Sequence, residues 1–316
     1  MKYRCMRFSV HRVLCGNLFL SIVLILSFAL LSLNSYAILG PPSALPAFDA
    51  NKSFDYLKKQ CSFGPRPPGS VAHEKTKNYL ASELKKYANS VILQNFTHKS
   101  GKDTLNLTNI IAMFGPNVDK KVILAAHWDT RPFADKESDP EKSKKPILGA
   151  NDGASGVAVL LEIARAFRSA PPPIKIIIVL FDGEDYGKKT SEMFLGSRYF
   201  ARNIRPEWFP DYGILLDMIG DKNLDVYIEQ NSQNAAPEVV NRVWKVAGDL
   251  GLKEFHNKIG YGITDDHVEL INVGIECIDL IDFEYPYWHT LQDTPDKCSP
   301  KSLGTIGKLL LELIYH

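Results

Sequence analysis

The sequence lacks an excess of charge of either sign, because 37 Lys and Arg residues stand against 36 Asp and Glu residues and leave a formal net charge of +1. This balance argues against nucleic-acid binding, which requires a basic patch or stripe that faces the phosphates. The five cysteines are too few for a scaffold held by disulfides. The 316 residues are 45% hydrophobic and 23% charged, which is typical of a globular protein with one large α/β domain or two small ones.

The first 37 residues contain no acidic side chain. Four basic residues precede an uncharged run over Leu14–Leu33, and Ser35–Ala37 has a small-x-small pattern. These features are typical of a secretory signal, so we expect cleavage after Ala37 and a secreted or periplasmic protein. An uncleaved membrane anchor is the alternative, because about 20 apolar residues can span a bilayer. Cleavage would leave 33 basic residues against 36 acidic ones, and the net charge would become −3.

Three cysteines remain after residue 37, namely Cys61, Cys277 and Cys298. Cys277 lies in an apolar, strand-like run and is expected to be a buried thiol. In an oxidising compartment, Cys61 and Cys298 are the more plausible pair for a disulfide, although sequence alone leaves this pairing open.

Residues 38–316 alternate between strand-like and helix-like segments. Ile174–Phe181 is β-branched and almost wholly apolar, as in a central strand covered on both faces. Gly153–Arg168 repeats apolar residues on one helical face, and Pro237–Leu250 begins with proline and is followed by Gly251. We expect further strands at 91–97, 107–114, 122–126, 212–219 and 275–281, and further helices at 73–89 and 301–315. The alternation predicts a single α/β domain with a central mixed, mostly parallel sheet covered by helices on both faces.

Polar side chains follow the predicted strands where the strands end, or precede a predicted helix. The residues at these points are His127, Asp152, Glu184, Asp185, Asp217 and His289. Because sites in open α/β sheets form at the carboxyl ends of strands, we expect these side chains to converge. Imidazole and carboxylate groups are the ligands of catalytic zinc, which keeps one open position and works with a nearby base.

Each of these residues also has an ordinary structural role available to it. Asp152 could cap the following helix, and Glu184 and Asp185 could lie in a solvated turn. Asp217 could be a turn residue, and a single histidine is more often hydrogen-bonded than metal-bound. Their joint placement at one sheet edge favours a metal site over these separate roles.

Eight short motifs occur in order between residue 63 and the C-terminus. They are Phe63-Gly64-Pro65-Arg66, His127-x-Asp129, Gly149-Ala150-Asn151-Asp152, Phe181-Asp182-Gly183-Glu184-Asp185, Gly196-Ser197-Arg198, Leu216-Asp217-Met218-Ile219-Gly220, Asp265-Asp266-His267 and Trp288-His289-Thr290. This ordered set resembles the zinc aminopeptidase superfamily and, within it, most closely the glutaminyl-peptide cyclotransferases (glutaminyl cyclases). The resemblance covers nearly all of the chain after the predicted signal.

The resemblance implies a zinc aminopeptidase-like fold with one Zn²⁺ per chain, bound by Asp152, Asp185 and His289. It implies Glu184 as the general acid/base. The implied reaction converts the N-terminal glutamine of a peptide or protein into pyroglutamate and releases ammonia.

The resemblance also assigns residues around Glu184 and the substrate. Asp217 and Asp265 would form a hydrogen-bonded acidic network beside Glu184. The residues expected to bind the substrate are Trp288, Tyr285, Phe283 and Ile263.

A two-zinc aminopeptidase is the alternative function. His127 and Asp217 would then hold a second zinc, and Glu184 would be the base for a bridging water. A binding protein with an inactive remnant of the site is a third, less favoured reading. We expect a monomer that binds no nucleic acid and, after signal cleavage, no membrane. The loops at 133–146 and 186–194 could be solvated insertions or could dock peptides.

Overall fold

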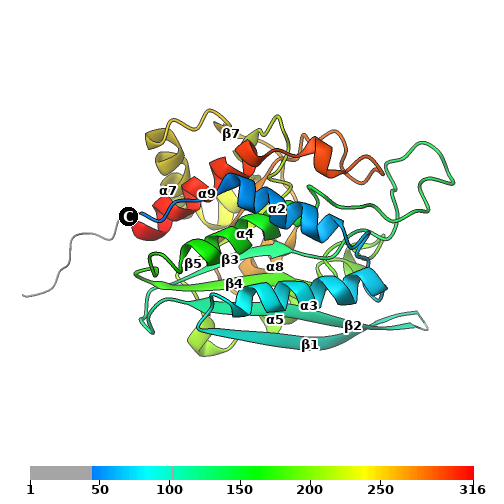
Figure 1. Cartoon of the computed structure of the whole chain (residues 1–316), viewed down its shortest axis with the longest axis horizontal. Helices are drawn as coiled ribbons and strands as arrows, with labels where there is room; N and C mark the ends of the chain where they lie inside the picture. The colour runs from blue at the N-terminus through cyan, green and yellow to red at the C-terminus, as the bar shows by residue number, and fades with distance from the viewer. Residues whose placement is uncertain (1–44, 102) are drawn as a thin grey trace, which may run out of the picture. The chain divides into compact units, whose positions relative to one another are not determined.

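The computed structural model of the protein describes residues 45–101 and 103–316 (Figure 1). Residues 45–316 form one unit. The expected signal segment, 1–37, lies outside the described residues, so its cleavage and the anchor alternative stay predictions. Within the described ranges, the structure contains no helix with the length and apolarity needed to cross a membrane.

A six-stranded sheet carries the fold, in the order β1-β2-β4-β3-β5-β8. Its strands are β1 (Ser90–Ser100), β2 (Asp103–Phe114), β3 (Lys121–His127), β4 (Lys175–Phe181), β5 (Tyr212–Asp217) and β8 (Cys277–Ile281). The pairs β3–β4, β3–β5 and β5–β8 are parallel, whereas β2 pairs antiparallel with β1 and β4. The predicted mixed, mostly parallel sheet is confirmed.

Helices cover both faces of the sheet (Figure 1). One face packs against α2 (Ala50–Cys61), α3 (Val71–Lys85), α4 (Ala154–Ala166), α7 (Pro237–Asp249) and α9 (Pro300–Tyr315). The other face packs against α5 (Leu195–Arg202) and α8 (Asp266–Ile271). In β4, Ile176 and Ile178 belong to the first core, while Ile177 and Val179 belong to the second. This alternation explains why the strand is apolar at nearly every position.

Several shorter elements lie between residues 190 and 297. A separate parallel pair contains β6 (Val226–Ile228) and β7 (Phe255–Ile259), and α6 (Gln230–Ala235) follows β6. Within residues 45–101 and 103–316, the single-turn 3₁₀ helices are η2 (Thr190–Glu192), η3 (Pro206–Trp208) and η4 (Pro295–Lys297). None of these short elements was predicted, because each is too brief to show a clear hydrophobic period.

The predicted main strands and long helices all occur, with small shifts at their ends. The predicted helix at 73–89 begins at Val71, because Ser70 caps it by accepting from the backbone N–H of His73, and it ends at Lys85. The predicted strand at 212–219 ends at Asp217, where the chain turns at Met218 with a positive φ of 47°. The helix α2 was missed, because the sequence before it is rich in proline.

All three described cysteines are free and buried. The prediction of a buried thiol at Cys277 is confirmed. The Cys61–Cys298 disulfide, which the sequence left open, is not formed. Burial raises the pKa of Cys61 to about 11 and the pKa of Cys298 well above its ordinary value, so the thiolate that would start oxidation is scarce at both positions.

A close contact between α4 and β5 brings two parts of the predicted site together. A Cβ atom on Gly156 would lie 2.3 Å from the backbone oxygen of Leu216, so only glycine permits this approach. Asp152 lies just before α4, and Asp217 is the next residue after Leu216. The contact therefore sets the distance between these two carboxylates.

Candidate active site

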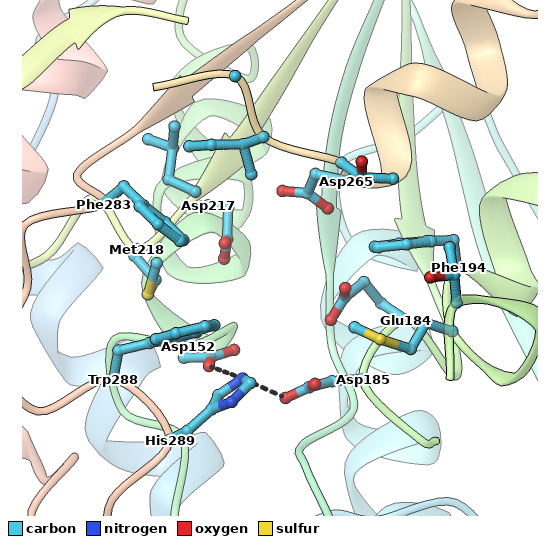
Figure 2. Close-up of a pocket in the computed structure, with 16 residues that line it drawn as sticks. Asp152, Glu184, Asp185, Phe194, Asp217, Met218, Asp265, Phe283, Trp288 and His289 are labelled. Atoms are coloured by element: carbon cyan, nitrogen blue, oxygen red, sulfur yellow. Dashed lines mark ion pairs between the residues drawn. The ribbon is translucent and has the colours of Figure 1, made fainter. Parts of the chain in front are cut away.

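The predicted site residues lie at one edge of the sheet, where parallel strands end. His127 is the last residue of β3, Asp217 is the last residue of β5, and Glu184 and Asp185 follow the end of β4. Figure 2 shows Glu184, Asp185 and Asp217 around one cavity, with Asp152 and His289 beside each other at its base. The sequence-based expectation that these side chains converge is confirmed.

Asp152, Asp185 and His289 form a group that could hold a metal ion, since one ligand atom of each lies within 4.8 Å of the others. The Nε2 atom of His289 lies 3.6 Å from Oδ2 of Asp152 and 3.5 Å from Oδ2 of Asp185. Ligand atoms about 2.0–2.2 Å from a tetrahedral zinc lie about 3.3–3.6 Å from one another. Oδ2 of Asp185 is buried and has no hydrogen-bond partner. The spacing, the unpaired oxygen and the nitrogen-and-oxygen donor set fit zinc.

His127, Asp152 and Asp217 form a second group of residues that could hold a metal ion. Here the contacts are shorter, because Nε2 of His127 lies 3.1 Å from Oδ1 of Asp152 and hydrogen-bonds Oδ1 of Asp217 at 3.2 Å. Burial alone would lower the pKa of His127, but the adjacent carboxylates of Asp129, Asp152 and Asp217 outweigh it and raise the pKa well above its usual value. A protonated His127 neutralises part of the surrounding negative charge.

Three buried carboxylates, on Glu184, Asp217 and Asp265, face the cavity from the side opposite His289 (Figure 2). Burial raises the pKa of Glu184 well above its ordinary value, and the charges of Asp185, Asp265 and nearby Asp266 raise it further. Burial raises the pKa of Asp265 to about 7, with a contribution from the charge of Asp217. Such a cluster holds protons at neutral pH, which is the property that proton transfer requires.

One residue that the sequence analysis left without a role, Asp129, fixes the turn after β4. Its Oδ1 accepts from the backbone N–H of Glu184 at 3.1 Å, and its Oδ2 accepts from that of Asp185 at 3.3 Å. The two consecutive side chains thereby diverge: Asp185 lies near His289, whereas Glu184 lies toward Asp265 (Figure 2). The motif His127-x-Asp129 was a signal for this residue, but not for its partners.

The cavity has a volume of about 300 Å³. Ile263, Phe283 and Trp288 line it, as predicted, and the ring centroids of Phe283 and Trp288 are 5.1 Å apart. Tyr285 is not among the described residues that line it. Its hydroxyl instead donates to Asp293 at 2.8 Å, away from the cavity.

Asp293 holds the backbone of the segment that carries Asp152. Besides the Tyr285 hydroxyl, its carboxylate accepts from the backbone N–H of Asn151 at 2.8 Å and from that of Asp152 at 3.2 Å. Tyr285 therefore acts on Asp152 through Asp293. No motif in the sequence pointed to Asp293.

Sequence reasoning also missed part of the cavity wall. The additional lining residues are Thr190, Met193, Phe194, Met218, Gly262, Thr264 and Ile281. In the described ranges, the non-glycine residues with positive φ are Phe194 (56°), Met218 (47°) and His289 (56°), and all three line the cavity. Non-glycine residues rarely adopt this conformation, and such strain gathers at functional sites.

Comparisons with known proteins agree with this geometry. The profile of Peptidase family M28 matches residues 109–314. The chain is 25% identical over 286 residues to a glutaminyl-peptide cyclotransferase of Boiga dendrophila, a match that covers 78% of this chain and 75% of that protein. The crystal structure of Bacteroides thetaiotaomicron glutaminyl cyclase bound to N-acetylhistamine is 39% identical, with a TM-score of 0.83 and coverage of 86% of this chain and 99% of that one.

A Zn-dependent exopeptidase from Parabacteroides distasonis is similarly related. It is 40% identical, with a TM-score of 0.84, and the match covers 86% of this chain and 100% of that one. The chain therefore belongs to Peptidase family M28 and, within the zinc aminopeptidase-like superfamily, resembles the glutaminyl cyclases.

Proposed function

We propose that the protein is a zinc-dependent glutaminyl-peptide cyclotransferase, which converts the N-terminal glutamine of a peptide or protein into pyroglutamate and releases ammonia. The main support is one juxtaposition: the buried carboxylate of Glu184 faces the same cavity as Asp152, Asp185 and His289. Trp288 forms part of the wall of this cavity, on the side opposite Glu184 (Figure 2). The similarity to glutaminyl cyclases supports the same reaction.

Asp152, Asp185 and His289 would hold one zinc ion. When bound, zinc supplies Lewis-acid chemistry to the γ-carbonyl oxygen of the substrate glutamine. The unpaired Oδ2 of Asp185 supports this ligand set.

Glu184 would move the proton of the reaction. The α-amine of the substrate attacks the amide carbon of its own side chain, so a new C–N bond forms and the bond to the amide nitrogen breaks. Glu184 takes a proton from the attacking amine and gives it to the leaving nitrogen, which departs as ammonia. Its raised pKa supports this role, because a carboxylate with higher proton affinity is a better base for the amine.

Asp217 and Asp265 would tune Glu184 without touching the reacting atoms. Both are buried beside it, and the charge of Asp265 raises the pKa of Glu184. Carboxylates that interact titrate as a group, so Asp217 and Asp265 would set the pH range over which Glu184 is deprotonated and able to accept the proton.

The cavity would orient the glutamine for ring closure. Its volume of about 300 Å³ suits one side chain with its amine rather than a long peptide segment. Ile263, Phe283 and Trp288 offer apolar walls around the methylene groups of that side chain. Holding the amine close to the amide carbon supplies the orientation that an intramolecular reaction needs.

A two-zinc aminopeptidase is the second candidate, and the group of His127, Asp152 and Asp217 favours it. In that case His127 and Asp217 would bind a second zinc, and Glu184 would be the base for water.

The experiment that separates the candidates uses glutaminyl-naphthylamide as substrate and elemental analysis of the purified protein. The proposal predicts ammonia release, an uncleaved naphthylamide bond and about one zinc per chain. Leucyl-naphthylamide is the control and should give no product. Release of free naphthylamine from either substrate, together with two zincs per chain, would support the aminopeptidase and reject the cyclotransferase.

A further inference from the structure

We propose that Arg131 and Asp135 are positioning residues, which together hold His289 and Asp185 in the orientation that binds the metal. The inference rests on the zinc site of the proposed function. Asp135 lies at the start of the 133–146 loop, which the sequence alone allowed to be either a solvated insertion or a peptide-docking segment, and Arg131 lies just before this loop. In the structure, this part of the loop packs against the ligand histidine.

Asp135 sets the orientation of the His289 ring. Its Oδ1 lies 3.0 Å from Nδ1 of His289, and the opposite ring nitrogen, Nε2, faces Asp152 and Asp185. If Nδ1–H donates to Asp135, the lone pair of Nε2 is directed toward the ligand group. A carboxylate behind a ligand histidine fixes the tautomer and increases the basicity of the ligand nitrogen.

Arg131 holds Asp135 and Asp185 with one guanidinium group. Its Nε donates to Oδ1 of Asp135 at 3.1 Å, and its Nη2 donates to Oδ2 of Asp135 at 2.8 Å. Its Nη1 donates to Oδ1 of Asp185. The other oxygen, Oδ2, has no hydrogen-bond partner and lies 3.5 Å from Nε2 of His289. The planar fork of arginine thus leaves one oxygen of Asp185 directed toward the metal position.

The residues that follow Asp135 also contact the segment that contains His289, through backbone and side-chain atoms. The N–H of Lys136 donates to the backbone oxygen of His289 at 3.2 Å, and Oε1 of Glu137 accepts from the N–H of Leu291 at 3.0 Å. The ammonium group of Lys136 lies 4.8 Å from the ring centroid of Trp288. These contacts on both sides of His289 support its unfavourable positive φ.

A surface ion pair without a role at the metal is the simpler alternative, but the burial of Arg131 argues against it. The side chain of Arg131 is 5% exposed and that of Asp185 is 2% exposed. Burying such charges costs free energy unless both remain paired and hydrogen-bonded. An arginine needed only to neutralise an exposed carboxylate could stay in solvent.

The test measures zinc affinity of the full chain by chelator competition after removal of bound metal. Asp135→Ala should weaken zinc binding by about 10–100-fold, as loss of such outer partners does in other zinc proteins. Asp139→Ala is the matched control, because Asp139 lies in the same loop and its carboxylate accepts from the backbone N–H groups of Glu141 and Lys142, not from a residue of the metal-ligand group. It should bind zinc as the wild type does.

Arg131 is tested by Arg131→Ala and Arg131→Lys. Both should weaken zinc binding, because lysine keeps the charge but cannot donate to Asp135 and Asp185 from one planar group. Thermal unfolding with and without zinc separates this role from a purely structural one. We expect the metal-free Asp135→Ala protein to unfold below the wild-type temperature, because the buried Arg131 loses two hydrogen bonds, and to gain less stability from added zinc than the wild type does.

The outcomes separate this inference from the proposed function. A wild type that binds no zinc would overturn both. Wild-type zinc binding with unchanged affinity in Asp135→Ala would overturn the positioning role alone, as would an equal loss in Asp139→Ala. Weakened zinc binding in Asp135→Ala, with wild-type affinity in Asp139→Ala, would support it even if the reaction proved to be peptide hydrolysis.

Discussion

Trp288 and His289 are consecutive residues whose rings stack, with centroids 4.0 Å apart and planes 30° apart. One residue lines the wall of the cavity, and the next belongs to the metal-ligand group. The left-handed backbone of His289 permits this arrangement, since adjacent side chains in an extended segment point to opposite sides. A single short segment therefore joins the wall of the cavity to the candidate metal group.

Trp288→Ala should separate these two functions. We expect a higher KM and a loss of about 10–100-fold in kcat/KM, because burial of a large aromatic side chain against substrate is worth roughly 1.5–3 kcal/mol. Zinc content should stay at the wild-type value, because the imidazole of His289 is kept by Asp135. Steady-state kinetics measures KM and kcat/KM, and elemental analysis measures the zinc content.

Tyr285→Phe is the matched control for an aromatic change near this segment. The variant loses the hydrogen bond to Asp293 but no part of the cavity wall. It should lower the free energy of unfolding by about 1 kcal/mol and leave KM unchanged. A KM as high as that of Trp288→Ala would show that Tyr285 contacts the substrate after all.

Glu184→Gln should abolish most of the turnover while zinc stays bound. The amide keeps the shape of the side chain but cannot accept the proton of the amine, so kcat should fall about 10²–10⁴-fold. Full activity of the variant would exclude Glu184 as the base. Loss of zinc along with activity would instead indicate that Glu184 is a ligand.

Asp265→Asn should move the pH dependence of kcat/KM. The charge of Asp265 raises the pKa of Glu184, so its removal should lower that pKa. Because Glu184 acts as a base when deprotonated, the acidic limb of the profile should shift to lower pH. Asparagine can still cap α8 as Asp265 does, so the fold should be kept. A shift of the limb to higher pH would contradict the assigned network.

Gly156→Ala tests the contact between α4 and β5. The added methyl group would meet the backbone oxygen of Leu216 at 2.3 Å, so we expect the free energy of unfolding to fall by about 1–3 kcal/mol. Gly248→Ala is the control, since α7 has open space at that position. It should raise stability by about 0.4–1 kcal/mol. Equal effects of the two changes in chemical denaturation would refute the contact.

The sheet and most of the site could be predicted from the sequence because local patterns encode them. The apolar run of β4 required cover on both faces, and the polar residues after it had to lie at the strand's carboxyl end. The direction of Tyr285 could not be predicted, because it depends on how the turn that joins it to Asp293 folds. The role proposed for Asp135 could not be predicted either, because β4, β5 and β8 separate Asp135 from His289 in the sequence although their side chains touch in space.

The most direct test of the proposed function is mass spectrometry of a peptide with N-terminal glutamine after incubation with the zinc-loaded protein. The cyclotransferase proposal predicts a product that keeps every residue and is lighter by one ammonia, with Glu184→Gln giving none. A product shortened by its first residue would contradict it.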